Sequence, residues 1–391
     1  MKYSVPLLLI LLVPGCKQPQ VPVQVQNDVD SIIFKYVPDR REGIYDLHLE
    51  ILKDHRLLIR GETNIPDAKE GIIKYFTESG IEYCDSLKII PDPVEIGKPW
   101  GIVSVSVCNI KKEPSHSSEM VTQAIMGTPV KILKKSDSWL LIQTPDYYIG
   151  WTAGSGIKDF DETEMAKWKK SKRLIFTEKS GDILSKNGDK SVVSDIVAGS
   201  IVSLVSDQSG NYIVGLPDGR QGLLNKNSSV NFCTWCHEIK PEAVKLISFA
   251  KSITGTPYMW GGTSTKLVDC SGFVKTVYFM GGIILSRDAS QQFLHGEEVD
   301  ISNSLDVLQP GDLLFFGSIN PEGQKRITHT GMYIGDAEFI HSSGMVKINS
   351  LDSTRSIYSS SLFKMLMGAR RIIGAESARG IEHIRSHEWY N

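Results

Sequence analysis

The feature that most constrains the fold is an internal repeat at an offset of 72 positions. The residues that carry it are Gly127 and Gly199, Val130 and Val202, Ile132 and Leu204, Pro145-Asp146 and Pro217-Asp218, and Gly150 and Gly222. In the first copy, segments 120–125, 130–134, 139–143 and 148–152 are rich in Val, Ile, Trp and Tyr and are separated by turn residues. Short strands of this kind form small barrels, so we expect two copies of one β module.

Both copies resemble bacterial SH3-like domains, in which a Gly-x-x-Val-x-Ile-Leu strand precedes a Trp-x-x-Ile strand and a Tyr-x-Gly-Trp ending. The first copy ends in Tyr148-Ile-Gly-Trp151, whereas the second has Arg220-Gln-Gly-Leu223 in that place. Any contact made by Tyr148 therefore belongs to the first copy only.

A second constraint comes from residues 258–273, with the sequence YMWGGTSTKLVDCSGF. A loop rich in Gly and Thr leads into Asp269-Cys270-Ser271-Gly272, and apolar residues at helical spacing follow, so Cys270 should lie at a helix N-terminus. Unpaired backbone N–H groups and the positive end of the helix dipole favour a thiolate. We therefore expect a lowered pKa for Cys270 and a nucleophilic sulfur.

Two histidines downstream could complete a catalytic arrangement, because a nucleophilic cysteine needs a base and a third polar group that orients the base. His329 begins one predicted strand, and His341 ends the next after a Gly335-Asp336 turn. Adjacent antiparallel strands would bring both rings to the same end of a sheet. We predict His329 as general base and acid, with a pKa near the working pH, and His341 as the residue that orients it.

These motifs together resemble the NlpC family of cell-wall cysteine peptidases. The resemblance covers about residues 240–373, through Tyr-x-Trp-Gly-Gly, Cys-Ser-Gly-Phe, Pro-Gly-Asp-Leu-Leu-Phe-Phe, His-Thr-Gly-Met-Tyr-Ile-Gly and a third histidine. With two SH3-like domains ahead of it, the arrangement looks like the γ-D-glutamyl-L-diamino acid endopeptidases of that family. This likeness implies a papain-like catalytic core, no cofactor or metal, and cleavage of murein peptides after γ-D-glutamate.

Carried over by position, the resemblance implies Cys270 as nucleophile, His329 as base and His341 as third member of a triad. It implies that the Tyr258 hydroxyl and the backbone N–H of Cys270 face the developing oxyanion. It also implies that Asp269 and Ser271 line the substrate cleft.

The resemblance further implies a clamp for the free amine of the substrate's L-alanine. Asp288 is the expected carboxylate from the catalytic domain, and Glu119 and Tyr148 are the candidates from the first SH3-like domain. A buried ammonium needs paired carboxylates, so such a clamp would restrict the enzyme to peptides with an unblocked N-terminus. Ala289 stands where a hydroxyl residue is often found in the family.

Residues 1–16 have the pattern of a targeting signal: Lys2, an apolar run over 5–13, and then Pro14-Gly15-Cys16. The apolar run is too short to span a bilayer. Its end resembles the lipobox of bacterial lipoproteins, which implies lipidation at Cys16 and a membrane anchor in the periplasm or cell envelope; the alternative is an ordinary cleaved signal. Residues 17–28 would then be a tether.

Export would place the five cysteines after Cys16 in an oxidising compartment. They are Cys84, Cys108, Cys233, Cys236 and Cys270, an odd number, so at least one is free and we expect it to be Cys270. Residues 233–237 match the c-type haem attachment pattern, but no helical haem-binding context surrounds them, so haem is not predicted. A local disulfide, a metal site and free thiols remain as alternatives there.

We therefore expect an α+β protein with a papain-like NlpC-type domain at residues 237–373. A small α+β domain at 29–110 and SH3-like barrels at 111–160 and 161–236 would precede it, the second with its linker, and a polar, peripheral tail would occupy 374–391. The formal charge of -2 does not suggest a nucleic-acid partner. The predicted function is cysteine peptidase action on murein stem peptides; the alternatives are a non-catalytic peptidoglycan-binding protein, or an amidase or acyltransferase on the same core.

Overall fold

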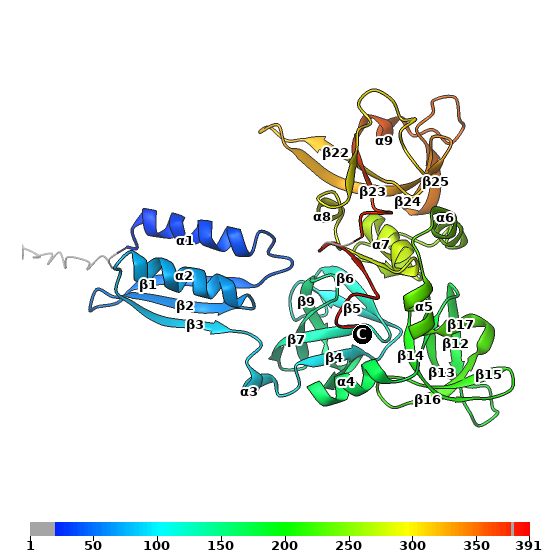
Figure 1. Cartoon of the computed structure of the whole chain (residues 1–391), viewed down its shortest axis with the longest axis horizontal. Coiled ribbons are helices and arrows are strands. Elements are labelled where there is room, and N and C mark those ends of the chain that lie inside the picture. The colour runs from blue at the N-terminus through cyan, green and yellow to red at the C-terminus, as the bar shows by residue number, and fades with distance from the viewer. Residues whose placement is uncertain (1–19, 377–378) are drawn as a thin grey trace, which may run out of the picture. The chain divides into compact units, whose positions relative to one another are not determined.

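The computed structural model describes residues 20–376 and 379–391 and divides at Ile90 into two compact units (Figure 1). The predicted signal segment and Cys16 lie outside the described residues. Within the two described ranges, no helix is long and apolar enough to cross a membrane.

The first unit is a small α+β domain. Its elements are α1 (Val23–Tyr36), β1 (Tyr45–Ile51), β2 (Leu57–Thr63), α2 (Pro66–Glu78) and β3 (Tyr83–Ile89). Strand β2 pairs antiparallel with β1 and parallel with β3. The expected tether at 17–28 differs from the structure, because α1 already begins at Val23 and buries Val29 against Ile72 and Phe76.

The second unit begins with two seven-stranded sheets that confirm the internal repeat. The first contains β4 (Trp100–Val103), β5 (Val107–Lys111), β6 (Met120–Ile125), β7 (Pro129–Ser136), β8 (Trp139–Gln143), β9 (Ile149–Ala153) and β10 (Ile157–Phe160). The second contains β11 (Arg173–Phe176), β12 (Ser180–Leu184), β13 (Val192–Val197), β14 (Ile201–Asp207), β15 (Asn211–Gly215), β16 (Gln221–Asn225) and β17 (Ser229–Asn231). The neighbour orders β10-β4-β7-β8-β9-β5-β6 and β17-β11-β14-β15-β16-β12-β13 match strand for strand.

The repeat extends beyond its predicted limits. Strands β4 and β5 both belong to the first sheet, where β4 pairs with β10 and β7 and β5 pairs with β9 and β6. The first module therefore begins near Trp100, and the expected boundary at residue 111 falls at the end of β5. Gly127 and Gly199 have φ angles of 83° and 85°, a left-handed conformation that favours glycine and explains why both copies keep it. In each sheet the pairings of the described strands run in open order from one edge to the other, so hydrogen bonding does not close a barrel.

The catalytic region follows helices α3 (Pro93–Ile96), α4 (Glu162–Lys170) and α5 (Phe232–Glu238). Its helices are α6 (Ala243–Ser252), α7 (Cys270–Met280), α8 (Ala289–Gln292) and α9 (Ser360–Lys364). Its strands are β18 (Thr263–Ser264), β19 (Leu267–Val268), β20 (Ile283–Leu285), β21 (Glu297–Val299), β22 (Leu313–Ile319), β23 (Lys325–Gly335), β24 (Glu338–Ser343), β25 (Met345–Ser350), β26 (Leu366–Arg371) and β27 (Ile381–His383).

Six of these strands form one sheet in the order β21-β26-β22-β23-β24-β25, and α7 packs on β23 and β24 (Figure 1). The apolar face of α7 enters the core through Phe273, Val274 and Val277, which meet Phe315 and Met332 of the sheet. All five side chains are 0% exposed, so close packing against the sheet fixes the position of α7, whose first residue is Cys270.

The C-terminal segment contradicts the prediction of a peripheral tail. Ile384, Trp389 and Tyr390 are buried, and Ile384 and Tyr390 join a cluster that includes Ile284 and Phe232. The polar composition of residues 374–391 suggested exposure, but the few large apolar residues among them are the ones that pack inward.

Candidate active site

Cys270 is the first residue of helix α7, as the sequence predicts, and Asp269 is its N-cap. Asp269 Oδ1 accepts a hydrogen bond from the Gly272 N–H at 2.7 Å, and Oδ2 accepts one from the Gly261 N–H at 2.9 Å. A Cβ at Gly272 would lie 1.9 Å from the Gly262 carbonyl oxygen. Only glycine at position 272 lets the Trp-Gly-Gly loop lie against the start of the helix. This close contact helps to fix the position of the thiol.

The pKa of the thiol differs from the sequence-based expectation. Burial, followed by the Asp269 carboxylate, raises the pKa of Cys270 to about 11, although the Thr330 N–H and the Arg287 guanidinium oppose this effect. The expected lowering is therefore wrong for the resting enzyme, because desolvation of a sulfur anion outweighs the helix N-terminus. Thiolate formation needs a base that accepts the proton, and the Thr330 N–H that lowers the pKa of the sulfur belongs to the residue that follows His329.

The two predicted histidines meet, as expected, on adjacent antiparallel strands. His329 lies inside β23 and His341 in β24, and His329 Nε2 is 2.7 Å from His341 Nδ1. Gly331 makes this approach possible, since a Cβ there would lie only 2.9 Å from the His341 Cβ. The strand register and one glycine thus bring the two rings into hydrogen-bonding contact.

Asn349 on β25, which the sequence analysis did not identify, fixes the tautomers of both rings. Its Nδ2 donates to the Ile357 carbonyl at 2.9 Å, so its Oδ1 is the atom that faces His341 Nε2 at 2.9 Å. An amide oxygen only accepts, so His341 carries its proton on Nε2 and presents a lone pair at Nδ1. His329 must then donate from Nε2, which leaves His329 Nδ1 unprotonated as the basic atom.

Burial also lowers the pKa of both histidines, and for His329 the neighbouring His341 acts in the same direction. The prediction that the pKa of His329 lies near the working pH is therefore wrong for the resting enzyme. Both rings are neutral at pH 7, which is the state that the chain from Asn349 to His329 requires.

Arg287 is a second residue that the sequence analysis missed. It is 1% exposed, and its guanidinium donates to Asp269 Oδ2 at 2.6 Å and to Ser271 Oγ at 2.9 Å. Its Nε donates to Thr122 Oγ1 of the first SH3-like domain at 2.9 Å. Asp269 and Ser271, which were expected to line the cleft, are 5% and 4% exposed, and both accept hydrogen bonds from Arg287.

Tyr258 is half-buried in the loop that precedes Cys270. Burial raises the pKa of Tyr258 to about 12, with the Cys270 sulfur and Asp269 acting in the same direction. The hydroxyl therefore keeps its proton and can act as a hydrogen-bond donor close to the sulfur. The first N–H groups of a helix have no intrahelical acceptor, so the Cys270 N–H is available as a second donor.

The structure brings together two of the three candidate clamp residues. The Tyr148 hydroxyl of the first SH3-like domain donates to Asp288 Oδ2 at 3.4 Å, and Asp288 directly follows Arg287. Glu119 is exposed and accepts a hydrogen bond at 2.8 Å from the indole of Trp260, which lies in the same loop as Tyr258. Asp288 keeps a side-chain exposure of 30%, so its carboxylate can be reached by a ligand.

The five cysteines that the structure describes all carry free thiols, including Cys270. Cys233 lies on α5 with its Sγ 3.8 Å from His237 Nδ1, and Cys236 is buried. Among residues 20–376 and 379–391, no three His, Cys, Asp or Glu side chains are grouped so that they could hold a metal ion.

Comparison with known proteins identifies two of the domains. Residues 255–371 match the NlpC/P60 family, and residues 110–157 match the bacterial dipeptidyl-peptidase SH3 domain. The first segment contains Cys270, His329 and His341, and the second contains Tyr148 and Glu119.

Two curated relatives span most of the same architecture. A γ-D-glutamyl-L-lysine dipeptidyl-peptidase of Bacillus cereus is 30% identical over 234 residues, which cover 58% of this chain and 68% of the relative. Dipeptidyl-peptidase 6 of Lysinibacillus sphaericus is 28% identical over 274 residues, covering 66% and 93%.

A solved structure of an NlpC/P60 family protein from Bacillus cereus shares the fold. It superposes with a TM-score of 0.61 at 24% identity and covers 70% of this chain and 99% of that protein. Together with the buried cysteine and the paired histidines, these similarities show that the chain belongs to the NlpC/P60 family of cell-wall cysteine peptidases.

Proposed function

We propose that this enzyme hydrolyses the bond between γ-D-glutamate and the diamino acid of murein peptides whose N-terminal L-alanine is free. The observation that carries this substrate assignment is the contact between Tyr148 of the first SH3-like domain and Asp288 of the catalytic domain. The names of the relatives from Bacillus cereus and Lysinibacillus sphaericus support a dipeptidyl-peptidase that acts at γ-D-glutamyl bonds.

Acylation begins with transfer of the Cys270 proton to His329 Nδ1. The resulting thiolate attacks the γ-carbonyl carbon of D-glutamate and forms a carbon–sulfur bond while the carbonyl oxygen becomes negative. The Cys270 N–H and the Tyr258 hydroxyl can donate to this oxygen, and one such donor typically supplies about 3 kcal/mol of transition-state stabilisation.

Collapse of the tetrahedral intermediate breaks the carbon–nitrogen bond. His329 gives its Nδ1 proton to the departing amine of the diamino acid, and a thioester between Cys270 and L-Ala-γ-D-Glu remains. Through this cycle His329 Nε2 keeps donating to His341 Nδ1, which steadies the imidazolium while it exists.

Deacylation reverses the roles of the same groups. His329 Nδ1 takes a proton from water, the hydroxide adds to the thioester, and the thiolate leaves and is reprotonated. The products are L-Ala-γ-D-Glu and a peptide with a new N-terminal diamino acid.

Selectivity for a free N-terminus follows from the charge at the Tyr148–Asp288 pair. An ammonium at this place could pair with the Asp288 carboxylate while the Tyr148 hydroxyl offers its oxygen as an acceptor. An acetylated amine has no charge and would leave Asp288 without that partner, so blocked peptides should react poorly.

Action in the cell envelope follows from the family, and we further propose a lipid anchor at Cys16. The supporting pattern is Lys2, the apolar run and Gly15-Cys16. Mass spectrometry of the N-terminal peptide from a bacterial host should detect a lipid on Cys16, and Cys16→Ser should move the protein from the membrane fraction to the soluble fraction. An unmodified Cys16, in a protein found only in the soluble fraction, would refute the anchor without affecting the enzymatic proposal.

The substrate assignment is tested with L-Ala-γ-D-Glu-L-Lys and L-Ala-γ-D-Glu-diaminopimelate, each with a free or an N-acetylated alanine. Wild type should release L-Ala-γ-D-Glu from the free peptides and much less from the acetylated ones, and Cys270→Ala should release none. Absence of cleavage in all four peptides would refute the peptidase assignment. Equal cleavage of free and acetylated peptides would refute the amine clamp only.

A further inference from the structure

The C-terminal segment 380–391, which we call the strap, lies outside the part of the chain that matches the NlpC/P60 family, residues 255–371. It is nevertheless packed into the protein: Ile384, His387, Trp389 and Tyr390 are each 2% exposed or less. We propose that the strap positions both halves of the amine clamp, Asp288 and Tyr148, and so sets the selectivity for a free N-terminus. This inference rests on the proposed function.

One end of the strap fixes the segment that carries Asp288. Strand β27 pairs antiparallel with β20, with Ile381 opposite Leu285 and His383 opposite Ile283. The Ser286 N–H donates to the Gly380 carbonyl at 3.1 Å, which extends the pairing beyond the strand. Asp288 lies two residues after Ser286, so these main-chain bonds define where its carboxylate begins.

The next part of the strap fixes the turn that presents Tyr148. His387 Nε2 donates to the Pro145 carbonyl at 2.9 Å, and His387 Nδ1 accepts from the Trp389 N–H at 3.2 Å. A neutral ring with its proton on Nε2 satisfies both bonds. Pro145 belongs to the turn in which the Thr144 N–H donates to the Tyr148 carbonyl at 2.9 Å. His387 therefore bonds directly to the turn that presents Tyr148.

Tyr147, the neighbour of Tyr148, shows that this turn needs outside support. Its φ angle of 66° lies in the left-handed region, which a tyrosine adopts only when its surroundings hold it there. The strap and the preceding Arg379 supply these surroundings: the Arg379 guanidinium lies 4.5 Å from the Tyr147 ring centroid, and the Trp389 ring centroid lies at 6.3 Å. Burial raises the pKa of the Tyr147 hydroxyl, and the Glu382 carboxylate lies close enough to raise this pKa further.

The end of the strap is anchored in both SH3-like domains. Trp389 packs edge-on against Trp100 with ring centroids 5.5 Å apart, and the Tyr390 carbonyl accepts from Arg173 Nη2 at 2.8 Å. The strap thus runs from β20 of the catalytic domain, past the turn that carries Tyr148, to the sheets of both SH3-like domains. This path ties the two clamp residues to one continuous segment.

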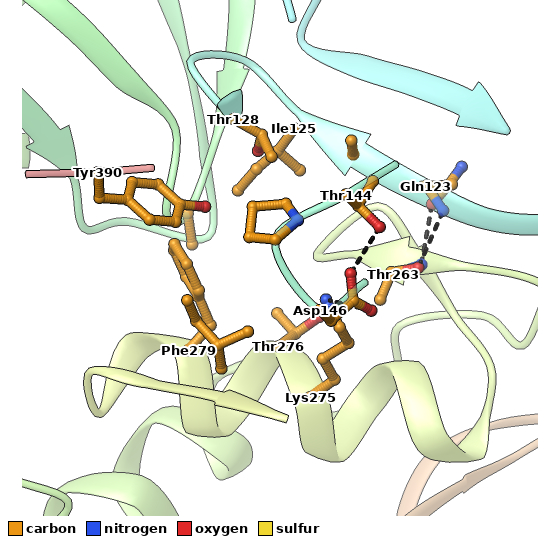
Figure 2. Close-up of a pocket in the computed structure, with 14 residues that line it drawn as sticks. Gln123, Ile125, Thr128, Thr144, Asp146, Thr263, Lys275, Thr276, Phe279 and Tyr390 are labelled. Carbon is orange, nitrogen blue, oxygen red and sulfur yellow. Dashed lines mark hydrogen bonds and ion pairs between the residues drawn. The ribbon is translucent and has the colours of Figure 1, made fainter. Parts of the chain in front are cut away.

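A second link holds the same turn independently of the strap. A small cavity of about 50 Å³ adjoins this turn. Figure 2 shows its lining, with Tyr390 on one side and Asp146 and Lys275 on another. Asp146 lies in the Tyr148 turn, and its Oδ2 is 3.3 Å from Lys275 Nζ on helix α7. Weakening the strap should therefore shift the turn rather than detach the domain, and the effect should appear in substrate binding.

The test replaces His387 in the full-length protein and measures kcat and KM on free and N-acetylated L-Ala-γ-D-Glu-L-Lys. His387→Ala removes the donor to Pro145; the KM for the free peptide should rise roughly 3- to 30-fold, the range expected for one lost hydrogen bond, with kcat within about twofold. The ratio of kcat/KM between free and acetylated peptide should fall by the same factor. His387→Gln, whose amide N–H can replace Nε2, should restore most of both values.

Arg385→Ala is the matched control, because this side chain is exposed on the same strap and should leave both values unchanged. KM and the selectivity ratio do not depend on how much enzyme is folded, so a purely structural role would change neither. If His387→Ala folds poorly, Tyr147→Phe removes the hydroxyl whose pKa burial and Glu382 raise but keeps the ring, and it should raise the KM in the same direction.

The outcomes separate the strap from the proposed function. Wild type that fails to prefer the free peptide would overturn the clamp and the strap together. Wild type that prefers it, with His387→Ala and Tyr147→Phe showing unchanged KM and ratio, would overturn the strap alone.

Discussion

Replacement of Asn349 by alanine tests whether the tautomer chain makes His329 a base. In the wild type, Asn349 Oδ1 accepts from His341 Nε2 at 2.9 Å, and His341 Nδ1 accepts from His329 Nε2 at 2.7 Å. Without this amide oxygen, His341 is free to carry its proton on Nδ1. That tautomer forces the His329 proton onto Nδ1, where it blocks uptake of the Cys270 proton.

The size of the effect follows from the bond that is lost. A neutral hydrogen bond contributes about 1 kcal/mol, and a buried donor left without its partner costs about 1–3 kcal/mol. Since Asn349 is only half-buried and water can replace part of the contact, we expect a loss of about 1–2 kcal/mol. This corresponds to a decrease of roughly 5- to 30-fold in kcat/KM.

The assay is release of L-Ala-γ-D-Glu from the free tripeptide across a range of pH. Asn349→Asp is the matched variant, because it keeps an acceptor at the same place and adds a charge that favours protonated histidine. It should retain most of the activity at pH 7 and move the acidic limb of the pH profile upward. Wild-type kcat/KM in Asn349→Ala, or an equal loss in both variants, would refute the tautomer chain.

Four further predictions concern other parts of the site. Burial lowers the pKa of His329 and His341, so the acidic limb of kcat/KM should lie below the ordinary histidine pKa of about 6.5; a midpoint at or above that pH would contradict the assignment. The unfolded chain then binds more protons than the native protein below about pH 6.5, so the free energy of unfolding should fall as the pH falls from there, which denaturant titrations at several pH values would measure. Arg287→Met should lower that free energy by about 3–5 kcal/mol because it leaves Asp269 buried without its partner, whereas Arg355→Met, at an exposed pair, should cost less than about 1 kcal/mol. Tyr148→Phe should raise the KM for the free tripeptide several-fold and leave the acetylated peptide unaffected; an equal effect on both peptides would argue against a contact with the amine.

The repeat and the nucleophile were accessible from the sequence because both depend on local patterns. Gly127 and Gly199 mark turns that need a left-handed residue, and the strands of the module are rich in Val, Ile, Trp and Tyr, a composition that each segment shows on its own. Cys270 at the start of a helix follows equally from the Gly-rich loop and the apolar spacing after it.

The residues that were missed act through contacts between distant segments. Asn349 resembles any polar residue of a half-exposed strand until the register places its side chain beside His341. Arg287 is a charged residue that would ordinarily be assigned to the surface, and only the fold shows that Asp269 and Thr122 surround it.

Two predictions were wrong for a related reason: the pKa of Cys270 is raised rather than lowered, and the large apolar residues of the C-terminal segment are buried rather than exposed. A helix N-terminus favours a thiolate, but the sequence does not show how completely the sheet and the loop exclude water from the sulfur. Likewise, Trp389 and Tyr390 stand in a polar segment, and their burial depends on surfaces contributed by Trp100 and Phe232.

The central claim, that Cys270 forms a thioester with L-Ala-γ-D-Glu, can be tested by trapping the intermediate. Enzyme that is turning over L-Ala-γ-D-Glu-L-Lys is quenched in acid, digested and analysed by mass spectrometry of the peptide that contains residue 270. If Cys270 forms this thioester, the wild type should carry one L-Ala-γ-D-Glu adduct on Cys270, and Cys270→Ala should carry none. Turnover without this adduct, or with an adduct on Cys84, Cys233 or another residue, would contradict the thioester at Cys270.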